Sequence, residues 1–303
     1  MNIALSSDDN YAKYAGVVIA SILYNNKNEN LNFYILDGGI TDENKEKINN
    51  LKIIAPCNIS FVKIDDSLFE DYKKIETHKY LSIAAYYRLK LSSLLPNIDK
   101  ILYLDCDVIV NSNIKELYNT DITQYYAAGV KDIACNTHHR KPILKNNSIY
   151  VNSGMLLFNL EKIRNDKIED KYYEYTLNNF DEIFIGDQQI INVVLQGHIK
   201  QLDDEWNLQS SNFINRSIYS RNPKLIHYIG KQKPWIFASL NYYKDLYFKY
   251  LQMTDWKYDG FEKWKYQKLS QISSIFKYII KKPFFLFRPR FYKAFYNTYL
   301  KQN

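Results

Sequence analysis

Apolar runs typical of strands alternate with helix-like segments along the first 64 residues, and this alternation constrains the fold more than any other feature. Strands are expected at Asn2–Ser7, Leu31–Leu36 and Asn58–Ile64, and helices at Tyr11–Tyr24 and Thr41–Leu51. The second helix opens with a threonine, a common helix N-cap. Strands that alternate with helices predict an α/β protein with a mainly parallel sheet.

The alternation continues to about residue 255, which predicts one large domain over residues 1–255 and a tail over residues 256–303. The further strands expected are Ile101–Leu104, Tyr126–Val130, Gly154–Asn159 and Leu225–Tyr228. The further helices expected are Ser82–Leu95, Lys167–Asn178, Asp187–Leu195 and Tyr242–Gln252.

The cysteines and the N-terminal residues exclude several classes of protein. Cys57, Cys106 and Cys135 are odd in number and form no CxxC pair, so neither a disulfide framework nor a structural zinc site is expected. Met1–Ser6 carries no basic segment followed by an apolar run, and we therefore expect a cytoplasmic protein. No run of about 18 apolar residues occurs, so no membrane-spanning helix is expected.

Two carboxylates follow an apolar strand directly. Ile101–Leu104 leads into Asp105-Cys106-Asp107, and the apolar segment Val108–Val110 comes next. In an extended segment, side chains two positions apart project from the same side of the chain. The alternative is a solvated turn, but acids placed between buried strands cost desolvation energy unless a cation compensates them. The pattern favours a site for Mg²⁺ or Mn²⁺ at the carboxyl end of a strand.

Segment Leu102–Val108 resembles the DxD strand of the retaining glycosyltransferases of family 8. This family includes bacterial lipopolysaccharide galactosyl- and glucosyltransferases and, more distantly, the glycogenins. Five further segments resemble its motifs in the expected order: Ala4–Tyr11, Tyr86–Leu89, Asn152–Asn159, Gly186–Gln189 and His227–Trp235. The resemblance covers residues 2–235. It implies a single nucleotide-sugar-binding domain of GT-A type over residues 1–255, with a mostly parallel sheet flanked by helices and a helical basic tail.

The resemblance also implies a set of site residues. The metal ligands would be Asp105, Asp107 and His227, and the nucleotide would meet Ser6, Asp8, Asn10, Tyr11, Gly230 and Lys233. The donor sugar would meet Arg88, Asp105, Asn152, Ser153, Asp187 and Gln188, of which Asp187 and Gln188 are the catalytic candidates. We expect acceptor contacts at Asp132 and Tyr80.

Residue chemistry supports these roles and leaves simpler ones open. An imidazole is a suitable third metal ligand, and an ammonium suits a leaving phosphate. His227 could instead be structural and Lys233 a solvated turn residue. Arg88 could form a surface ion pair, and Asp187 could be only a helix N-cap, as could Asp9 or Asn10.

The implied reaction transfers galactose or glucose from a UDP-sugar to a saccharide acceptor, such as lipopolysaccharide, lipooligosaccharide or another surface glycan, with Mn²⁺ or Mg²⁺. It retains the anomeric configuration, although an amide, Gln188, stands at the matching position and retaining hydrolases use a carboxylate nucleophile. Double displacement and a front-face path both remain open, and we favour the second. Two departures are Gln189, where many relatives have Asp, and Ile185, where some have an aromatic residue.

The positive excess in the net charge of +7 belongs to the tail, because no Asp or Glu occurs from Lys263 to Asn303. Its mixture of Lys, Arg and aromatic residues is typical of segments that lie on anionic membranes. We therefore expect a lipid-linked acceptor and a peripheral position on the inner face of the membrane. The alternative is a helix packed on the main domain. No nucleic-acid-binding module is present, and no nucleic acid is expected.

Two other classes of protein remain as alternatives. A metal-dependent nucleotidyl-type transferase would share the α/β sheet and the paired acids, but it would not account for the His227–Trp235 segment. A non-catalytic protein that binds UDP-sugars or membranes would not need Asp105, Asp107 and His227, which are all present. The sequence contains neither a P-loop nor a GxGxxG motif.

Overall fold

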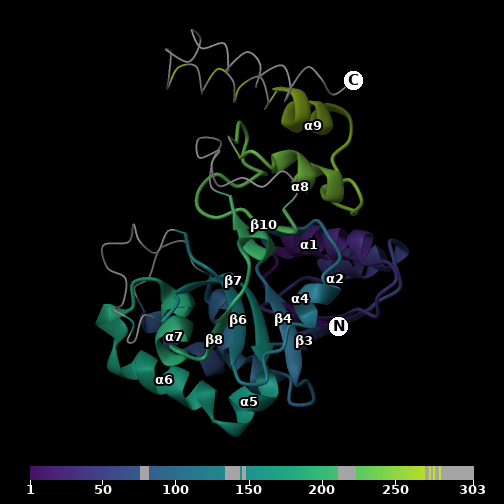
Figure 1. The fold of residues 1–303 in the computed structure, drawn as a ribbon. Helices are drawn as coiled ribbons and strands as arrows, with labels where there is room; N and C mark the ends of the chain where they lie inside the picture. Colours follow the sequence, from purple (N-terminus) through teal and green to yellow (C-terminus); the bar gives the residue numbers. More distant parts are fainter. Residues whose placement is uncertain are drawn as a thin grey trace.

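The computed structural model describes residues 1–75, 82–133, 144, 148–210, 223–239 and 241–269, with residues 273, 276 and 280 as single positions. Within these ranges, a seven-stranded sheet carries helices on both faces, and a three-stranded sheet lies beside it (Figure 1). None of the helices in the described ranges is long and apolar enough to cross a bilayer.

The seven-stranded sheet is mostly parallel, as the sequence predicts. Its strands, in spatial order, are β3 (Asn58–Lys63), β2 (Asn32–Asp37), β1 (Asn2–Ser7), β4 (Lys100–Leu104), β7 (Val151–Asn159), β6 (Ala127–Lys131) and β8 (Ile199–Gln201). Strand β7 is the exception, since it runs antiparallel to both β4 and β6. The carboxyl ends of β1 and β4 therefore meet at the same edge of the sheet.

Different helices cover the two faces of this sheet. One face packs against α1 (Ala12–Asn25), α2 (Asp42–Asn49) and α4 (Lys115–Tyr118). The other packs against α3 (Leu91–Leu94), α5 (Leu160–Asn165), α6 (Ile168–Asn178) and α7 (Gly186–Val194). Short 3₁₀ segments lie at Asn50–Ile53, Asp66–Phe69, Tyr72–Lys74, Ile83–Lys90, Phe180–Glu182 and Asp204–Asn207. The predicted N-cap of α2 is confirmed, because the Thr41 side chain accepts a hydrogen bond from the Asn44 amide.

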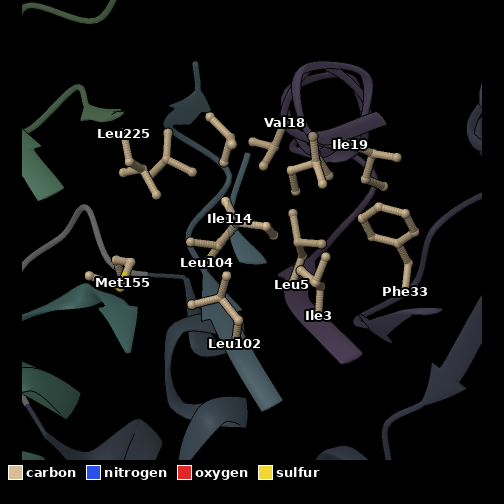
Figure 2. Packing of buried hydrophobic residues seen from close by; sticks show 14 of the residues in the cluster. Ile3, Leu5, Val18, Ile19, Phe33, Leu102, Leu104, Ile114, Met155 and Leu225 are labelled. Carbon is tan, nitrogen blue, oxygen red and sulfur yellow. The ribbon is translucent and has the colours of Figure 1, made fainter. Parts of the chain in front are cut away.

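Strand β1 shows how the two cores arise from one alternating sequence. Ile3 and Leu5 face α1 and pack with Val18 and Ile19 (Figure 2), whereas Ala4 faces the opposite core. Successive side chains of a strand point to opposite faces, so both faces of a central strand must be apolar. The run of apolar residues in β1 meets that requirement.

The three-stranded sheet joins distant parts of the chain. It consists of β5 (Val108–Val110), β10 (Leu225–His227) and β9 (Leu208–Gln209). In the antiparallel pairing of β10 with β5, His227 lies opposite Val108. This register brings His227 next to Asp107. The strand packs further against α8 (Lys244–Leu251) in a third apolar cluster.

The predicted helix Ser82–Leu95 differs from the structure. A 3₁₀ segment, Ile83–Lys90, occupies most of this range, and only α3 is α-helical. The Arg88 Nε–H donates to the Ala85 carbonyl at 2.8 Å, and an α-helix would offer that carbonyl to the Leu89 amide. The side chain thus competes with the regular backbone ladder.

The described start of the tail packs on the main body. It forms α9 (Gly260–Trp264) and a π-helical turn at Lys265–Leu269, close to α8 (Figure 1). Trp256 fills the space where a Cβ of Gly16 in α1 would lie. Tyr258 stacks on Tyr266 at 4.8 Å between ring centroids. The predicted boundary at residue 255 stays a prediction.

Candidate active site

The acid pair lies on a turn between β4 and β5, not in the extended segment that the spacing suggested. The reason is that the chain changes sheets between Leu104 and Val108. The Cys106 thiol points inward and donates to the Ser6 carbonyl at 3.1 Å, and burial raises its pKa well above the usual value. The two aspartates flank this buried thiol.

Asp105, Asp107 and His227 converge. One ligand atom from each lies within 4.8 Å of the others. His227 Nε2 is 3.1 Å from Asp107 Oδ1, and within the described part of the chain this buried oxygen has no other partner. A Cβ at Gly154 would overlap the His227 ring and lie 2.7 Å from Asp105 Oδ2. The space and the donor set both fit a divalent cation such as Mn²⁺ or Mg²⁺.

Arg88 is buried beneath the acid pair and is not a surface residue. Its Nη2 donates to Asp105 Oδ1 at 2.6 Å, and its Nη1 donates to the Ser153 carbonyl at 2.6 Å. The guanidinium also lies over the Tyr103 ring at 4.3 Å. Burial alone would lower the pKa of Arg88, but the charges of Asp105 and Asp187 hold it above the ordinary value.

Asp187 is buried in the first turn of α7 and faces Arg88. The N-cap of α7 is Ile185, so the alternative role of Asp187 as the N-cap is wrong. Burial raises the pKa of Asp187 to about 6, although Arg88 acts in the opposite direction and Asp105 adds to the rise. Its position beside Arg88 puts it at the predicted sugar site.

Lys233 belongs to a short loop that closes over Asp107. Its ammonium donates to Asp107 Oδ2 and to the Tyr228 carbonyl. Burial would raise the pKa of Asp107, but Lys233 and His227 together hold it well below its usual range. Gly230 has a φ of +66°, and a Cβ added there would meet no atom within 4 Å. Glycine is therefore needed at this position for its backbone conformation and not for lack of space.

Aromatic stacking anchors the same loop. The Trp235 ring stacks on Tyr14 of α1 at 4.0 Å with an interplanar angle of 21°. Its ring centroid also lies 5.3 Å from that of Tyr247 in α8. The loop therefore has a fixed attachment close to Lys233.

Ser6, Asp8, Asn10 and Tyr11, four of the predicted nucleotide residues, lie at or just after the end of β1. Ser6 Oγ lies 3.2 Å from the Tyr103 hydroxyl, and Asp8 accepts from the Tyr11 amide at 3.0 Å. Asn10 is exposed, and so is the Tyr11 ring at 41%. A nucleotide base can therefore approach Tyr11 from solvent.

The first turn of α1 has no side-chain cap. Its N-cap is Tyr11, so the alternative role of Asp9 or Asn10 as the cap is wrong. Asp9 instead accepts from the Thr41 amide and hydroxyl, both at 2.8 Å, and fastens the start of α2.

A network of amides lies among the residues predicted to bind the donor sugar. Gln188 Nε2 donates to Asp132 Oδ2 at 2.8 Å. Gln188 Oε1 accepts from the Ser153 amide at 3.1 Å and from Asn152 Nδ2 at 3.2 Å. The structure thus brings Asp132 to Gln188, and its acceptor role stays a prediction. Tyr80 lies outside the described residues.

The two departures from the family pattern lie beside this network. Gln189 points away from the site, since it accepts from the Phe184 amide at 2.9 Å and donates to the Glu182 carbonyl at 2.7 Å. It therefore holds the loop before α7 in place. Ile185 lies at the end of that loop, as the N-cap of α7.

Two site residues were missed in the sequence. Tyr103 lies 3.3 Å from Asp105 Oδ1 through its hydroxyl. Its position two residues before Asp105, near the end of the strand that leads into the acid pair, was an available signal. Asn207 donates to Asn152 Oδ1 at 3.0 Å from a short 3₁₀ segment that no pattern distinguishes.

The chain is similar to known glycosyltransferases over most of its length. The family described as "Glycosyl transferase family 8" matches residues 2–238. A putative glycosyltransferase of Haemophilus influenzae is 36% identical over 244 residues, which are 78% of this chain and 73% of that protein. A lipopolysaccharide 1,2-glucosyltransferase of Escherichia coli K12 is 29% identical over 277 residues, which are 86% of this chain and 80% of that protein.

A solved structure supports the predicted GT-A fold. The galactosyltransferase LgtC, crystallised with donor and acceptor sugar analogs, superposes with a TM-score of 0.74. It is 24% identical, and the match covers 87% of this chain and 99% of LgtC. The prediction of one GT-A type sheet with flanking helices is therefore confirmed.

Proposed function

This chain belongs to glycosyl transferase family 8, and on that premise we propose that it transfers galactose or glucose from a UDP-sugar to a saccharide acceptor, with retention of configuration. That it is a glycosyltransferase follows from the family. The observation that carries the finer proposal is the convergence of Asp105, Asp107 and His227 beside Lys233. Two acids, an imidazole and an ammonium suit a diphosphate with its cation.

Asp105, Asp107 and His227 would hold Mn²⁺ or Mg²⁺. When bound, such a cation neutralises the donor diphosphate and stabilises the charge that develops on the leaving group. Lys233 adds a cation beside Asp107 that can pair with a phosphate oxygen instead. Tyr11, half exposed at the end of β1, offers a ring face to the base.

Arg88 and Asp187 would bind the hydroxyls of the donor sugar. Both are buried, and Asp187 Oδ2 accepts no hydrogen bond within the described part of the chain. A buried carboxylate oxygen with free acceptor capacity suits a sugar hydroxyl, because a charge-assisted hydrogen bond is strong and directional. Asn152 and Ser153 would line the same pocket.

The bonding of Gln188 supports a front-face reaction. Its carbonyl oxygen already accepts two hydrogen bonds, from Ser153 and Asn152, which use both lone pairs. An oxygen engaged in this way is a poor nucleophile for a double displacement. In the front-face path the acceptor hydroxyl attacks from the side on which UDP leaves, and the β-phosphate takes its proton. Gln188 then orients the sugar and Asp132 contacts the acceptor.

The acceptor is proposed to be a lipid-linked saccharide of a surface glycan. The Escherichia coli relative named above acts on lipopolysaccharide by its name. In the tail, Phe261, Phe276 and Ile280 are exposed at 70%, 62% and 78%. No acidic residue follows Glu262 in this segment. These features support binding to an anionic membrane, and hence a peripheral position on the cytoplasmic face.

A donor panel tests the transfer reaction. Purified protein is incubated with UDP-galactose, UDP-glucose and other UDP-sugars, with Mn²⁺ or with a chelator, and released UDP is measured. We expect release from UDP-galactose or UDP-glucose that needs the metal and is lost in Asp105→Asn. Release from neither sugar under any condition, with intact binding of UDP, would favour a non-catalytic protein. Release of pyrophosphate from a nucleoside triphosphate would favour a nucleotidyl-type transferase.

Liposome co-sedimentation tests the membrane proposal. The full chain is compared with a truncation after Leu269, which keeps the packed Tyr266. We expect the full chain to sediment with vesicles that contain an anionic lipid and the truncated chain to remain in solution. Equal partitioning of the two chains would contradict a role of the tail in membrane binding.

A further inference from the structure

The side-chain oxygen of Asn152 is surrounded by hydrogen-bond donors. It accepts from the Gly154 amide at 3.2 Å and from Asn207 Nδ2 at 3.0 Å. His227 Nδ1 also lies 3.0 Å from it. Asn152 and His227 are both buried, at 8% and 4% exposure. The imidazole is thus held from its Nδ1 side by a residue outside the cluster of metal ligands.

The neighbours of Asn152 determine which end of its amide is the oxygen. A backbone N–H is always a donor, so the atom that faces the Gly154 amide must be an acceptor. The opposite end faces Gln188 Oε1 at 3.2 Å and Asp132 Oδ2 at 3.4 Å. Both are acceptors, so that end must be the NH₂ group. In a flipped amide, the NH₂ group would face the Gly154 N–H, and the oxygen would face the acceptor oxygens of Gln188 and Asp132.

This orientation in turn determines the tautomer of His227. A ring nitrogen 3.0 Å from the carbonyl oxygen of Asn152 must carry the proton, so Nδ1 is the N–H. In the neutral ring, Nε2 then carries the lone pair. Nε2 is the nitrogen that faces Asp107 Oδ1 at 3.1 Å, on the side of the proposed cation.

We propose that Asn152 is a positioning residue that holds His227 in the tautomer protonated at Nδ1 and so presents Nε2 to the divalent cation. The inference rests on the proposed metal site. An imidazole without such a partner populates both tautomers, and only one of them can bind the cation through Nε2. Partners of this kind fix both the tautomer and the ring direction of metal-binding histidines. Asp132 and Gln188 extend the support, since they hold the NH₂ end of Asn152.

The first test needs no substitution in the network. Protein loaded with Mg²⁺, a diamagnetic cation, and carrying ¹⁵N-labelled histidine is studied by long-range ¹H–¹⁵N correlation. The His227 signals are assigned by their loss in His227→Gln. We expect the shifts of the Nδ1–H tautomer. The Nε2–H tautomer in the wild-type protein would overturn the inference.

Substitutions then separate positioning from a general loss of structure. In Asn152→Ala we expect a mixture of tautomers and an affinity for Mn²⁺ alone that is lower by about 10- to 100-fold. Asn152→Asp keeps an acceptor for Nδ1–H and should keep the wild-type tautomer. Asn207→Ala removes only a second donor to the same oxygen and should leave the tautomer unchanged. Wild-type tautomer and affinity in Asn152→Ala would also overturn the inference.

The outcome is independent of turnover. If His227 shows the Nδ1–H tautomer and binds Mn²⁺ but no UDP-sugar is consumed, the proposed function fails and the inference about Asn152 stands. If UDP-sugar is consumed but His227 shows the Nε2–H tautomer, the proposed function stands and the inference about Asn152 fails.

Discussion

Arg88 Nε lies 3.2 Å from Asp187 Oδ2 but donates its hydrogen to the Ala85 carbonyl at 2.8 Å. The buried carboxylate therefore has a cation beside it and an oxygen that accepts no hydrogen bond within the described ranges. The other two Arg88 nitrogens, Nη2 and Nη1, donate to Asp105 and to the Ser153 carbonyl. The free energy cost of burying Asp187 in its charged form is thus only partly offset, which raises its pKa to about 6.

Asp187→Asn should stabilise the metal-free protein at neutral pH. The folded protein binds the Asp187 proton more tightly than the unfolded chain, whose pKa is near the ordinary value of 3.8. Between about pH 4 and about pH 6, the unfolding free energy therefore falls as pH rises, and above that range this contribution is constant. Asn has no such titration. The stability of Asp187→Asn relative to wild type should therefore rise by about 3 kcal/mol as the pH increases through this range.

Urea denaturation of both proteins from pH 4 to pH 7 measures this difference. Asp181→Asn, at an exposed position before α7, is the matched control and should change stability by less than about 0.5 kcal/mol. A difference between Asp187→Asn and wild type that does not vary with pH would contradict the role of buried charge. Transferase activity of Asp187→Asn should fall in the same preparations.

Removal of the metal should abolish transfer and leave the protein folded. Each carboxylate of the acid pair already has a protein cation, since Asp105 pairs with Arg88 and Asp107 with Lys233. Chelation therefore leaves no unpaired buried charge in this pair. The circular dichroism spectrum after EDTA should match that of the loaded protein. The thermal melt should still be cooperative and should shift down only by the stabilisation that bound Mn²⁺ supplies, and added Mn²⁺ should restore UDP release. Unfolding on chelation, as in small zinc domains, would be inconsistent with this pairing.

Gly154→Ala should abolish binding of Mn²⁺ without unfolding the protein. The added methyl group would occupy the position of the His227 ring and crowd Asp105 Oδ2, so the ligands could not converge. Gly129→Ala in β6 is the matched control, because its methyl group would meet Leu156 Cδ2 at 2.8 Å and lie away from the ligands. That variant should lose about 1–3 kcal/mol of stability and still bind Mn²⁺. Calorimetric titration with Mn²⁺ distinguishes the two.

Lys233→Gln should change metal binding and turnover in opposite directions. The ammonium beside Asp107 repels a divalent cation in the absence of nucleotide, so its removal should raise the affinity for Mn²⁺ alone several-fold. Loss of a cation that stabilises the leaving phosphate should lower kcat by about 10²- to 10³-fold. Lys233→Arg keeps the charge and should bind Mn²⁺ as the wild type does. Parallel losses of metal affinity and kcat in Lys233→Gln would show that the lysine instead supports the metal site.

Much of the donor half of the site could be predicted from local patterns. An apolar strand that runs into Asp105 and Asp107 carries its own signal, because burial of two acids needs compensation. The third member of the cluster was predicted from the family resemblance and not from local patterns. His227 reaches Asp107 through a three-residue pairing of β10 with β5, and strands this short have too little periodicity to predict a partner or a register.

Side-chain competition with the backbone also escaped prediction. The apolar spacing over Ser82–Leu95 is that of an α-helix. The hydrogen bond from the Arg88 side chain to the Ala85 carbonyl cannot be predicted from such spacing. Gln189 is a similar case, since the sequence shows only that it departs from the family pattern, and in the structure it holds a loop in place. Such roles depend on where a polar group finds its partner, which only the folded chain defines.

The pairing of β10 with β5 also has a consequence for the order in which the molecule is made. Lys233 and Asp107 are 126 positions apart, and both Lys233 and His227 reach Asp107 only once β10 has joined β5. A chain still attached to the ribosome can form β1 to β4 with its first helices before β10 is made, since synthesis proceeds from the N-terminus. Until β10 is made, the acid pair lies on a nearly complete sheet and lacks its third ligand. We expect the nascent chain to acquire its cation site in one late step of synthesis, after residue 233 has left the exit tunnel.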